Sequence, residues 1–599
     1  MIQLLKRMRR REALMALFCA VLVVGQVYFD LRLPDYMTEL TKLIKTPGSS
    51  TGDILSVGGE MLLCTLCSAV LAVGCGYLSA RTAAGFSFSV RRDLFHHVMD
   101  AGSEEMQTFS VPSLITRTTN DITQIQMIVA MGLQMLMKAP IMAVWAVIKI
   151  LGKSWTLSAV TAGFVVALVT LVLLIMSSCL PRFRRVQKKT DEINRVAREN
   201  LTGINVVHAF GAEDYQNKKF DGPSRDMMDL QLKNQRLFAL LQPAMGLGMN
   251  GLALAIYWVG AALVESIART DMAGRLTMFT NVLVFSTYAT YVVMSFMMLV
   301  MIFMLLPQAQ VSAERINEVL NTKPHVVEGS KTEGCETGTV EFRDVSFRYP
   351  HAAADELEHI SFRVERGQTL AIIGATGSGK TTLAGLIPRF YDATQGTVLV
   401  DGVDVRDYTF DALYDRLGYV TQKAVLFSGT VQDNIFFGQS EAADTDETLQ
   451  QALQLSLQAA LSLSQAAEFV DKYPEKAAHP IAQLGRNVSG GQKQRLSIAR
   501  ALARRPEILI FDDSFSALDY KTDATLREGL AKQLPGTTKI IVAQRISTIR
   551  HADQILVLDR GEIAGLGTHD ALMASCPVYR EIAMSQLSEE ELKKGGASK

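Results

Sequence analysis

Six long apolar stretches in the first half of the chain limit its fold more than any other feature. They cover residues 13–29, 61–80, 127–150, 156–180, 237–264 and 276–306. Each is long enough to cross a bilayer as a helix, which takes about 20 predominantly apolar residues. Because lipid offers no partners for backbone N–H and C=O groups, such stretches are stable as helices that bond internally. Residues 1–320 are therefore predicted to form an all-α transmembrane domain of six helices.

A basic segment, Lys6-Arg7-Met8-Arg9-Arg10-Arg11, precedes the first span. It resembles the start of a signal peptide, but no small-residue cleavage site follows, and we interpret the first span as uncleaved. The positive-inside rule then places this end in the cytoplasm. Since six spans return the chain to its starting side, both termini are predicted to be cytoplasmic.

The loops after the second and fourth spans are long and charged, and they cover residues 81–126 and 181–236. Their helical periodicity predicts that the helices of the spans continue well beyond the membrane. An inserted soluble domain is the alternative, but neither loop is apolar enough to bury a core of its own.

Lys138 lies near the middle of the third span. An ionisable residue at that depth is a candidate functional group. It either faces a water-filled cavity and meets substrate, or pairs with a carboxylate on a neighbouring helix.

The apolar pattern stops after the sixth span. Residues 321–338 are predicted to be a linker, residues 339–587 a soluble α/β domain, and residues 588–599 a tail. Lys+Arg and Asp+Glu are balanced at 60 each. Without an excess of positive charge, no nucleic-acid partner is expected.

The soluble domain contains the motif Gly374-Ala375-Thr376-Gly377-Ser378-Gly379-Lys380-Thr381-Thr382, which fits a phosphate-binding P-loop. An apolar strand pattern precedes it and a helical pattern follows. Glycines let backbone N–H groups close around phosphates, and the helix N-terminus adds partial positive charge. Lys380 is expected to reach the β/γ-phosphates and Thr381 to bind Mg²⁺. The residues predicted to hold the nucleotide here are Gly374, Thr376, Gly377, Ser378, Gly379, Lys380, Thr381 and Thr382.

Further motifs lie around the P-loop. They are Phe347-Arg348-Tyr349-Pro350, Tyr419-Val420-Thr421-Gln422, Val488-Ser489-Gly490-Gly491-Gln492, Ile508-Leu509-Ile510-Phe511-Asp512 and Ser516-Ala517-Leu518-Asp519. With them, nearly the whole chain resembles half of an ATP-binding cassette (ABC) transporter of the exporter type. The resemblance implies a six-helix membrane domain followed by an α/β P-loop ATP-binding cassette. It also implies ATP and Mg²⁺ as cofactors, and a second half-transporter, membrane lipid and a small-molecule substrate as partners.

The resemblance also implies a role for each matched residue. Tyr349 stacks on adenine, and Gln422 and Asp512, with Thr381, surround the Mg²⁺. The family's signature motif corresponds to Val488-Ser489-Gly490-Gly491-Gln492 here, with valine in place of its first leucine. The remaining signature residues contact the γ-phosphate on the opposite subunit, and they are Ser489, Gly490, Gly491 and Gln492.

Two positions depart from the family pattern. Residues 508–512 correspond to the family's Walker B strand. The family has a glutamate directly after this strand, where this chain has Asp513. It has a switch histidine where this chain has Gln544. Aspartate is one methylene shorter, and a general base must reach its proton within hydrogen-bond distance. Glutamine has no titratable nitrogen. These catalytic positions, together with Gln483-Leu484-Gly485-Arg486-Asn487, resemble the degenerate-site subunit of bacterial heterodimeric multidrug exporters, which implies a multi-pass protein of the bacterial plasma membrane.

Two cytoplasmic segments match the coupling helices of the family. Residues 109–114 lie where the first is expected, and residues 199–213 resemble the second, which docks on the opposite cassette. Closure of the two cassettes on ATP can thereby move the spans.

The leading hypothesis is ATP-driven export of a hydrophobic or amphipathic substrate, drug-like or lipid-like, by a heterodimer. The intact signature of this chain would serve a partner that carries the missing glutamate and histidine. A homodimeric lipid or drug flippase and an exporter-fold importer are alternatives. Two further alternatives are a membrane-anchored P-loop ATPase and a regulatory subunit that binds ATP without hydrolysing it.

Overall fold

The computed structural model describes the chain except residues 46–48, 351, 439–446 and 587–599, so the predicted tail at 588–599 lies outside the described residues. The chain forms two compact units. One unit contains Met1–Met99 and Val111–Thr322, and the other contains Asp100–Ser110 and the chain from Lys323 onward.

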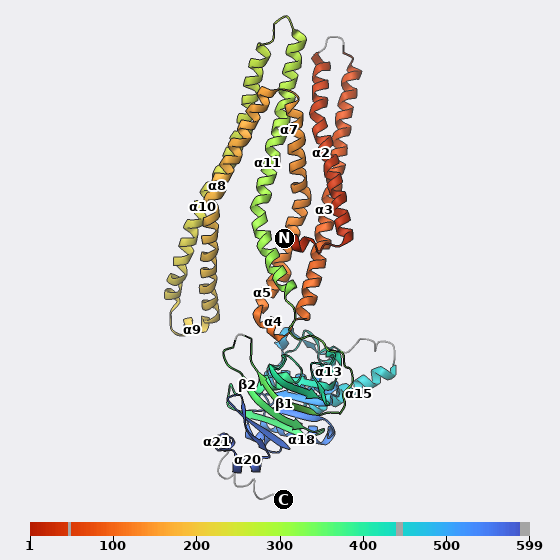
Figure 1. The fold of residues 1–599 in the computed structure, drawn as a ribbon, viewed down its shortest axis with the longest axis vertical. Coiled ribbons are helices and arrows are strands. Elements are labelled where there is room, and N and C mark those ends of the chain that lie inside the picture. The colour runs from red at the N-terminus through yellow and green to blue at the C-terminus, as the bar shows by residue number, and fades with distance from the viewer. Residues whose placement is uncertain (46–48, 351, 439–446, 587–599) are drawn as a thin grey trace. The chain divides into compact units, whose positions relative to one another are not determined.

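The membrane unit is helical throughout its regular structure (Figure 1). Its elements are α1 (Ile2–Leu5), α2 (Arg10–Lys45), α3 (Thr51–Met99), α5 (Val111–Thr116), η1 (Arg117–Asp121), α6 (Ile122–Met131), η2 (Gly132–Leu136), α7 (Met137–Leu151), α8 (Trp155–Thr202), α9 (Ile204–Ala209), α10 (Glu213–Glu265) and α11 (Met272–Asn321). Both η elements are π-helical turns within one continuous third span.

Six helical stretches of the described chain are long and apolar enough to cross a membrane. They are Arg10–Lys45, Thr51–Met99, Val111–Leu151, Trp155–Cys179, Glu213–Glu265 and Met272–Ile302. The predicted fold class, a six-helix membrane domain followed by an α/β cassette, is confirmed. The helices also continue past the apolar segments as predicted, since α3, α8 and α10 have 49, 48 and 53 residues.

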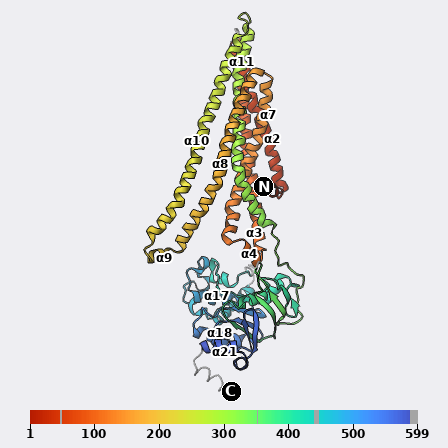
Figure 2. The ribbon, with the colours of Figure 1, turned by 60° about the vertical axis from the view of Figure 1, so that its left-hand side comes forward.

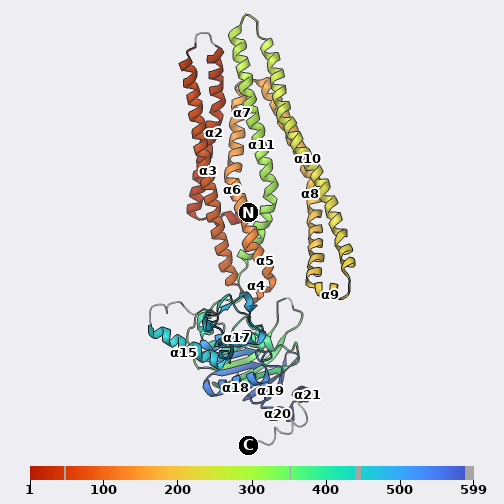
Figure 3. The same ribbon diagram turned by 180° about the vertical axis from the view of Figure 1, so that it is seen from behind.

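Helices α8 and α10 run side by side over most of their length, with α9 between them at the turn (Figures 2 and 3). Small residues let them approach each other closely. A Cβ at Gly248 of α10 would come within 2.7 Å of the Leu168 side chain of α8. In lipid, helices gain nothing from the hydrophobic effect when they associate, because lipid tails are as apolar as the side chains. Close van der Waals packing between the helices takes its place.

Ion pairs join α2, the first membrane span, to α7 in the third span. Lys138 Nζ lies 3.0 Å from Asp30 Oδ2, and Lys149 Nζ lies 2.6 Å from Asp35 Oδ2. Tyr288 of α11 is fully buried and donates its hydroxyl to Asp35 Oδ1 at 2.7 Å. The structure therefore supports the second of the two roles considered for Lys138, a pair with a carboxylate on a neighbouring helix.

The other unit contains two sheets and α4 (Ser103–Thr108). The six-stranded sheet has the order β12-β11-β3-β10-β9-β6, with β12 antiparallel to β11 and every other pair parallel. Its strands are β3 (Thr369–Gly374), β6 (Leu417–Val420), β9 (Ile508–Asp512), β10 (Thr538–Val542), β11 (Gln554–Asp559) and β12 (Glu562–Gly567). The antiparallel sheet, β2-β1-β4-β5, contains β1 (Val340–Phe347), β2 (Leu357–Val364), β4 (Gln395–Val400) and β5 (Val403–Asp404).

Helices and short elements cover these sheets. They are α12 (Lys380–Leu386), α13 (Phe410–Arg416), β7 (Gly429–Thr430), α14 (Val431–Ile435), α15 (Glu447–Leu463), α16 (Ala467–Val470), η3 (Lys476–Ala478), β8 (Pro480–Ile481), η4 (Gln483–Gly485), α17 (Gly490–Ala503), α18 (Tyr520–Gln533), α19 (Ile546–Ile549), α20 (His569–Ser575) and α21 (Pro577–Gln586).

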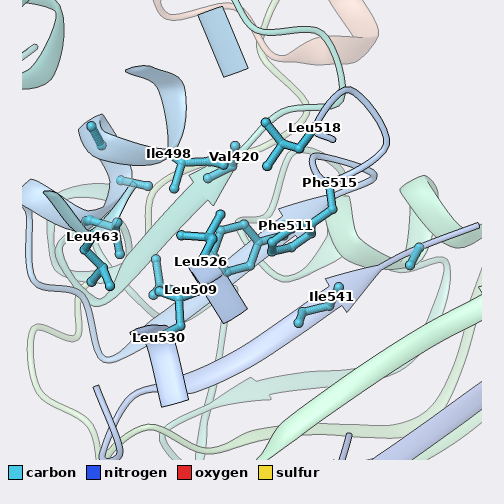
Figure 4. Close-up of a cluster of buried hydrophobic side chains, with 14 of the residues drawn as sticks. Val420, Leu463, Ile498, Leu509, Phe511, Phe515, Leu518, Leu526, Leu530 and Ile541 are labelled. Atoms are coloured by element: carbon cyan, nitrogen blue, oxygen red, sulfur yellow. The ribbon is translucent and has the colours of Figure 1, made fainter. Parts of the chain in front are cut away.

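The parallel strands are buried on both faces, which explains their continuous apolar sequences. Because side chains alternate along a strand, Leu509 and Phe511 of β9 enter one core. Ile508 and Ile510 enter the other. Figure 4 shows Leu509 and Phe511 packed with Leu526 and other side chains of the first core. The sheet is thus held from both sides, and the loops at its carboxyl edge have a rigid support.

The stretch predicted as a linker is hydrogen-bonded to the cassette. Gly329 N donates to Tyr408 O at 2.9 Å, and Glu336 N donates to Asp401 O at 3.0 Å. The domain limits predicted at residues 320 and 338 remain a prediction. The bonded segment means that the chain is already attached to the cassette several residues before β1.

The Lys138–Asp30 pair gives a first prediction. Lys138→Met leaves a carboxylate without its cation inside a membrane-spanning unit, so the protein should lose about 1–3 kcal/mol of stability. The double variant Lys138→Met with Asp30→Asn should recover most of it. Thermal unfolding in detergent measures the stability of the single and double variants. Lys218→Met, at an exposed position of α10, is the control. Equal stability of Lys138→Met and Lys218→Met would show that the pair has no structural role.

Candidate functional site

The P-loop connects β3 to α12 at the carboxyl edge of the parallel sheet. Gly377 and Gly379 have φ angles of 81° and 91°, which side chains with a Cβ rarely adopt. A Cβ at Gly379 would also lie 2.7 Å from Leu357 Cδ2, and one at Gly374 would clash with the backbone oxygen of Leu558. The backbone conformation at residues 377 and 379 and the close atoms around residues 374 and 379 therefore favour glycine. The loop leads directly into the N-terminus of α12.

Lys380 begins α12 and folds back over the loop. Its Nζ donates to the backbone oxygens of Gly374 at 3.0 Å and Ala375 at 2.7 Å. Burial lowers the pKa of Lys380, while the charges of Asp513 and Asp512 act in the opposite direction. No ion pair to Lys380 is present among the described residues. A half-buried cation without a bound carboxylate, beside a helix N-terminus, fits a polyphosphate.

Thr381 and Asp512 bring oxygen atoms together next to the loop. Thr381 Oγ1 donates to Asp512 Oδ1 at 3.0 Å, and Tyr419 Oη donates to Asp512 Oδ2 at 3.2 Å. Burial raises the pKa of Asp512, although these two hydrogen bonds work against the shift. Mg²⁺ is usually held by one or two protein oxygens together with phosphate oxygens and water. Thr381 and Asp512 thus fit a site that would hold Mg²⁺ and bring its positive charge to the phosphates, whereas the side chain of Gln422 bonds to the adjacent Asp513.

Tyr419 is a site residue that sequence reasoning missed. Its strand, β6, pairs in parallel with β9, and Tyr419 lies opposite Ile510. Parallel neighbours end at the same edge of a sheet. The pairing of β6 with β9, had it been predicted, would have placed Tyr419 near the Walker B carboxylate.

Asp513 is held by the two glutamines that the sequence singled out. Gln544 Nε2 donates to Asp513 Oδ2 at 2.7 Å, and Gln422 Nε2 donates to the same oxygen at 3.2 Å. Asp513 is buried, and its φ angle is 48°. The structure therefore brings Asp513, Gln544 and Gln422 into one hydrogen-bonded group, which we call the carboxylate clamp.

Tyr349 lies close to the P-loop helix. Its hydroxyl shares a hydrogen bond with Thr382 Oγ1 at 2.9 Å. The rings of Phe347 and Tyr391 each form a T-shaped pair with its ring, with centroid distances of 4.9 and 5.4 Å. These contacts orient an aromatic ring beside the phosphate loop, as a base-stacking residue requires.

The signature residues form the N-terminus of α17. Ser489 Oγ accepts from Gln492 N at 3.3 Å, and Gln492 Oε1 accepts from Ser489 N at 2.8 Å, a reciprocal capping box. A Cβ at Gly490 would meet no atom within 4 Å, so this surface is open. Within the described chain, no hydrogen bond joins Ser489, Gly490, Gly491 or Gln492 to the P-loop.

Fold and site together define a P-loop ATPase fused to a six-span helical membrane domain. The family model described as the ABC transporter transmembrane region matches residues 17–296, and the family model described as ABC transporter matches residues 357–516. An uncharacterized ABC transporter ATP-binding protein of Mycobacterium tuberculosis is 38% identical over 92% of this chain and 93% of its own length. The chain therefore belongs to the ABC transporter family, and its ATPase domain couples ATP hydrolysis to transport across the membrane.

Other relatives agree with this assignment. An ATP-dependent lipid A-core flippase of Aromatoleum aromaticum is 32% identical over 86% of this chain and 82% of its own length. The solved structure of a bacterial Atm1-family ABC exporter with ATP bound matches 97% of this chain and 100% of that chain, with a TM-score of 0.78 and 24% identity. The exporter fold, with membrane and ATP-binding domains fused in one chain, is thus shared.

The position of Lys380 gives a second prediction. Lys380→Ala removes the cation next to the phosphate loop, so ATP should bind this chain roughly 10–100-fold more weakly. Photolabelling of this chain with an azido-ATP analogue, followed by separation of the subunits, measures its own site. Lys532→Ala, which removes an exposed lysine paired with Glu528, is the control. Equal labelling of both variants would contradict the assignment of the P-loop.

Proposed function

We propose that this chain is the degenerate-site half of a heterodimeric exporter for a hydrophobic or amphipathic substrate. The observation that carries the proposal is the carboxylate clamp. A general base must accept a proton from a water held within hydrogen-bond distance. In this chain, Asp513 Oδ2 already accepts two amide N–H groups, from Gln422 and Gln544.

The clamp makes Asp513 a poor base for two physical reasons. The N–H groups of Gln422 and Gln544 both occupy Asp513 Oδ2, which leaves less room at that oxygen for the O–H group of an attacking water. Aspartate is also one methylene shorter than glutamate, and small errors in position are costly in rate. Gln544, in the histidine position, holds Asp513 and has no nitrogen that can exchange a proton. The P-loop, Lys380 and Thr381 remain suited to binding, so this site should retain ATP and hydrolyse it slowly.

The signature surface supports a partner with its own catalytic residues. Ser489 and Gly490 present hydroxyl and backbone N–H groups at the N-terminus of a 14-residue helix. Such groups stabilise negative charge on a phosphate. We propose that they complete the site of a second half-transporter, which carries glutamate and histidine where this chain has Asp513 and Gln544.

Contacts of α4 support coupling between ATP and the spans. Gln107 Nε2 donates to Tyr391 Oη at 2.9 Å, and the Tyr391 ring packs edge-on against Tyr349 at 5.4 Å. Glu105 Oε1 accepts from His325 N and from its ring nitrogen Nδ1, both at 3.0 Å. If Tyr349 moves when the adenine of ATP binds, the movement can therefore reach α4 through the contact between Tyr349 and Tyr391 and the hydrogen bond between Tyr391 and Gln107.

The turn at α9 supports docking on another cassette. Leu201, Val206 and Phe210 are 76%, 60% and 81% exposed around this short helix. Apolar side chains gathered at the tip of a helical hairpin indicate a covered interface in the assembly. We propose that this tip docks on the partner's cassette, and that both termini of this chain lie in the cytoplasm of a bacterial cell.

A second candidate is lipid flipping by two copies of this chain. The relatives named lipid A-core flippases favour it, since two of them are 32% and 30% identical to this chain. The subunit composition of the transporter purified with its native neighbours separates the candidates. Two different half-transporters support the proposal, and one kind of chain supports the flippase homodimer.

The clamp gives a third prediction. In the assembled heterodimer, Asp513→Asn should leave most ATP hydrolysis intact, because Asp513 does not act as the working base. Replacing the partner's glutamate by glutamine should reduce hydrolysis about 10²–10⁴-fold. Steady-state ATPase rates of the two single variants measure this asymmetry.

The reverse change tests the same site from the other direction. Asp513→Glu with Gln544→His should raise hydrolysis at this chain's site when the partner's glutamate is already glutamine. If Asp513→Asn alone abolishes hydrolysis, Asp513 is a working base and the degenerate-site proposal is wrong.

The contact between α4 and His325 gives a fourth prediction, for pH dependence. The hydrogen bond with Glu105, followed by the charge of Glu104, raises the pKa of His325. A group with a raised folded pKa contributes stability below its unfolded pKa of about 6.5, and that contribution is lost as pH rises through the folded value. The contact should therefore loosen above neutral pH.

Hydrogen exchange of α4, corrected for intrinsic rates, should increase between pH 6 and 9 by up to about fivefold, since the His325 ring is exposed and the pair is weak. His325→Gln should abolish the pH dependence. His359→Gln, which removes a similar exposed pair with Asp344, is the matched control. A pH dependence that persists in His325→Gln would rule out this origin.

A further inference from the structure

An apolar cavity lies within the membrane unit beside the first helix. Its volume is about 310 Å³, and every residue that lines it is apolar or glycine. Its walls include Leu5 and Met8 near α1, Gly132, Leu133 and Met137 in the third span, and Leu306 in α11. These residues lie in the half of the third apolar stretch that follows the loop at residues 81–126, and at the end of the sixth stretch that precedes the cassette. The cavity therefore lies in the half of the helix bundle that is next to the basic segment.

The first helix is anchored over this cavity. Leu4 is fully buried. Arg9 N donates to Glu12 Oε2 at 3.0 Å, and the buried Glu12 also accepts from Ser89 Oγ of α3 at 3.4 Å. Arg7 Nη2 donates to Asn321 Oδ1 at 3.4 Å at the end of α11. The cavity is thus closed on one side by a segment that side-chain contacts hold to the bundle.

The third span is widened where it faces the cavity. Residues Gly132–Leu136 form the π-helical turn η2, which inserts extra backbone into the helix. Turns of this kind are rare and are concentrated at functional sites. A Cβ at Gly132 would meet no atom within 4 Å. The backbone irregularity and the missing side chain both leave space at the same place.

The segment that contributes Leu5 and Met8 to the cavity wall is strongly basic, and we call it the basic rim. The basic segment, residues 6–11, contributes five exposed cations, Lys6, Arg7, Arg9, Arg10 and Arg11. None of them forms an ion pair with a carboxylate in the part of the chain that the structure describes. Basic groups at a membrane surface attract anionic lipids, by about 1 kcal/mol for each residue. An apolar cavity with a cationic rim is complementary to a molecule with a hydrocarbon chain and an anionic head.

We propose that this cavity binds an acyl chain of an anionic phospholipid whose phosphate is held by the basic segment. The lipid belongs to the leaflet that faces the basic segment, and it is a resident ligand rather than cargo. A volume of 310 Å³ accommodates on the order of ten methylene-sized groups. Because the chain enters the cavity from lipid of similar polarity, its burial adds shape-selective packing rather than hydrophobic free energy. The attraction of the basic segment for the phosphate, about 1 kcal/mol for each basic residue, sets the preference for an anionic lipid.

Native mass spectrometry of the intact purified transporter tests the site. The protein is titrated with phosphatidylglycerol, phosphatidylcholine or glycerol 3-phosphate. Phosphatidylglycerol should be retained at concentrations about tenfold lower than phosphatidylcholine, and glycerol 3-phosphate should not be retained. Equal retention of the two lipids, or retention of glycerol 3-phosphate alone, would overturn the proposal.

Two variants separate the chain pocket from the basic rim. Gly132→Phe places a ring in the open space at the π-turn and should reduce retention of both lipids about tenfold. Gly76→Phe, at another helical glycine with no atom within 4 Å of its Cβ, is the matched control. The triple variant Lys6→Gln, Arg10→Gln and Arg11→Gln should remove the preference for phosphatidylglycerol and leave phosphatidylcholine binding unchanged.

Three results would contradict the assignment. Gly132→Phe could retain phosphatidylglycerol as well as Gly76→Phe does, which would place the lipid elsewhere. The triple variant, which alters only exposed side chains, could keep the full preference for the anionic lipid. Gly132→Phe could also dissociate the subunits without changing lipid retention, which would show that a helix of a second subunit fills the cavity.

Discussion

Parallel pairing of β3, β10 and β9 is the constraint on which the nucleotide site depends. It brings the carboxyl end of β3 to the same edge of the sheet as those of β9 and β10, which come more than a hundred residues later in the chain. The P-loop and Asp512 meet there, and the Thr381–Asp512 hydrogen bond of 3.0 Å is a direct result. Two apolar cores press on the sheet from opposite faces, so the edge is rigid where the chemistry requires fixed distances.

The same edge also brings together the two positions that depart from the family pattern. Asp513 follows β9, and Gln544 follows β10, so neighbouring strands deliver both side chains to the same point. In the arrangement observed, each satisfies the other through a 2.7 Å hydrogen bond. Gln422 Nε2 donates to the same oxygen at 3.2 Å, so the buried Asp513 keeps one partner when Gln544 alone is changed. The direct hydrogen bond between Asp513 and Gln544 still couples the two positions, and the effects of changing them are expected to be non-additive.

Features encoded by neighbouring residues could be predicted from the sequence, and features that depend on long-range contacts could not. The six spans and the P-loop are continuous patterns, and each was visible in a single stretch. Asp30 lies 108 positions from Lys138, and Gln107 lies 284 positions from Tyr391, so neither partner could be inferred from spacing. Tyr419 required knowledge of strand order. The π-turn at Gly132–Leu136 has no sequence signature comparable to a helix cap.

Helix α10 has a mechanical consequence. Its 53 residues span about 80 Å, whereas the hydrocarbon core of a bilayer is about 30 Å thick. About 50 Å of stiff rod therefore extends beyond the membrane on the side of α9. A rotation of about 10° within the membrane would displace the far end of that rod by roughly 9 Å. One continuous helix thus joins the spans to the α9 tip, so a small tilt among the spans becomes a much larger displacement at the tip.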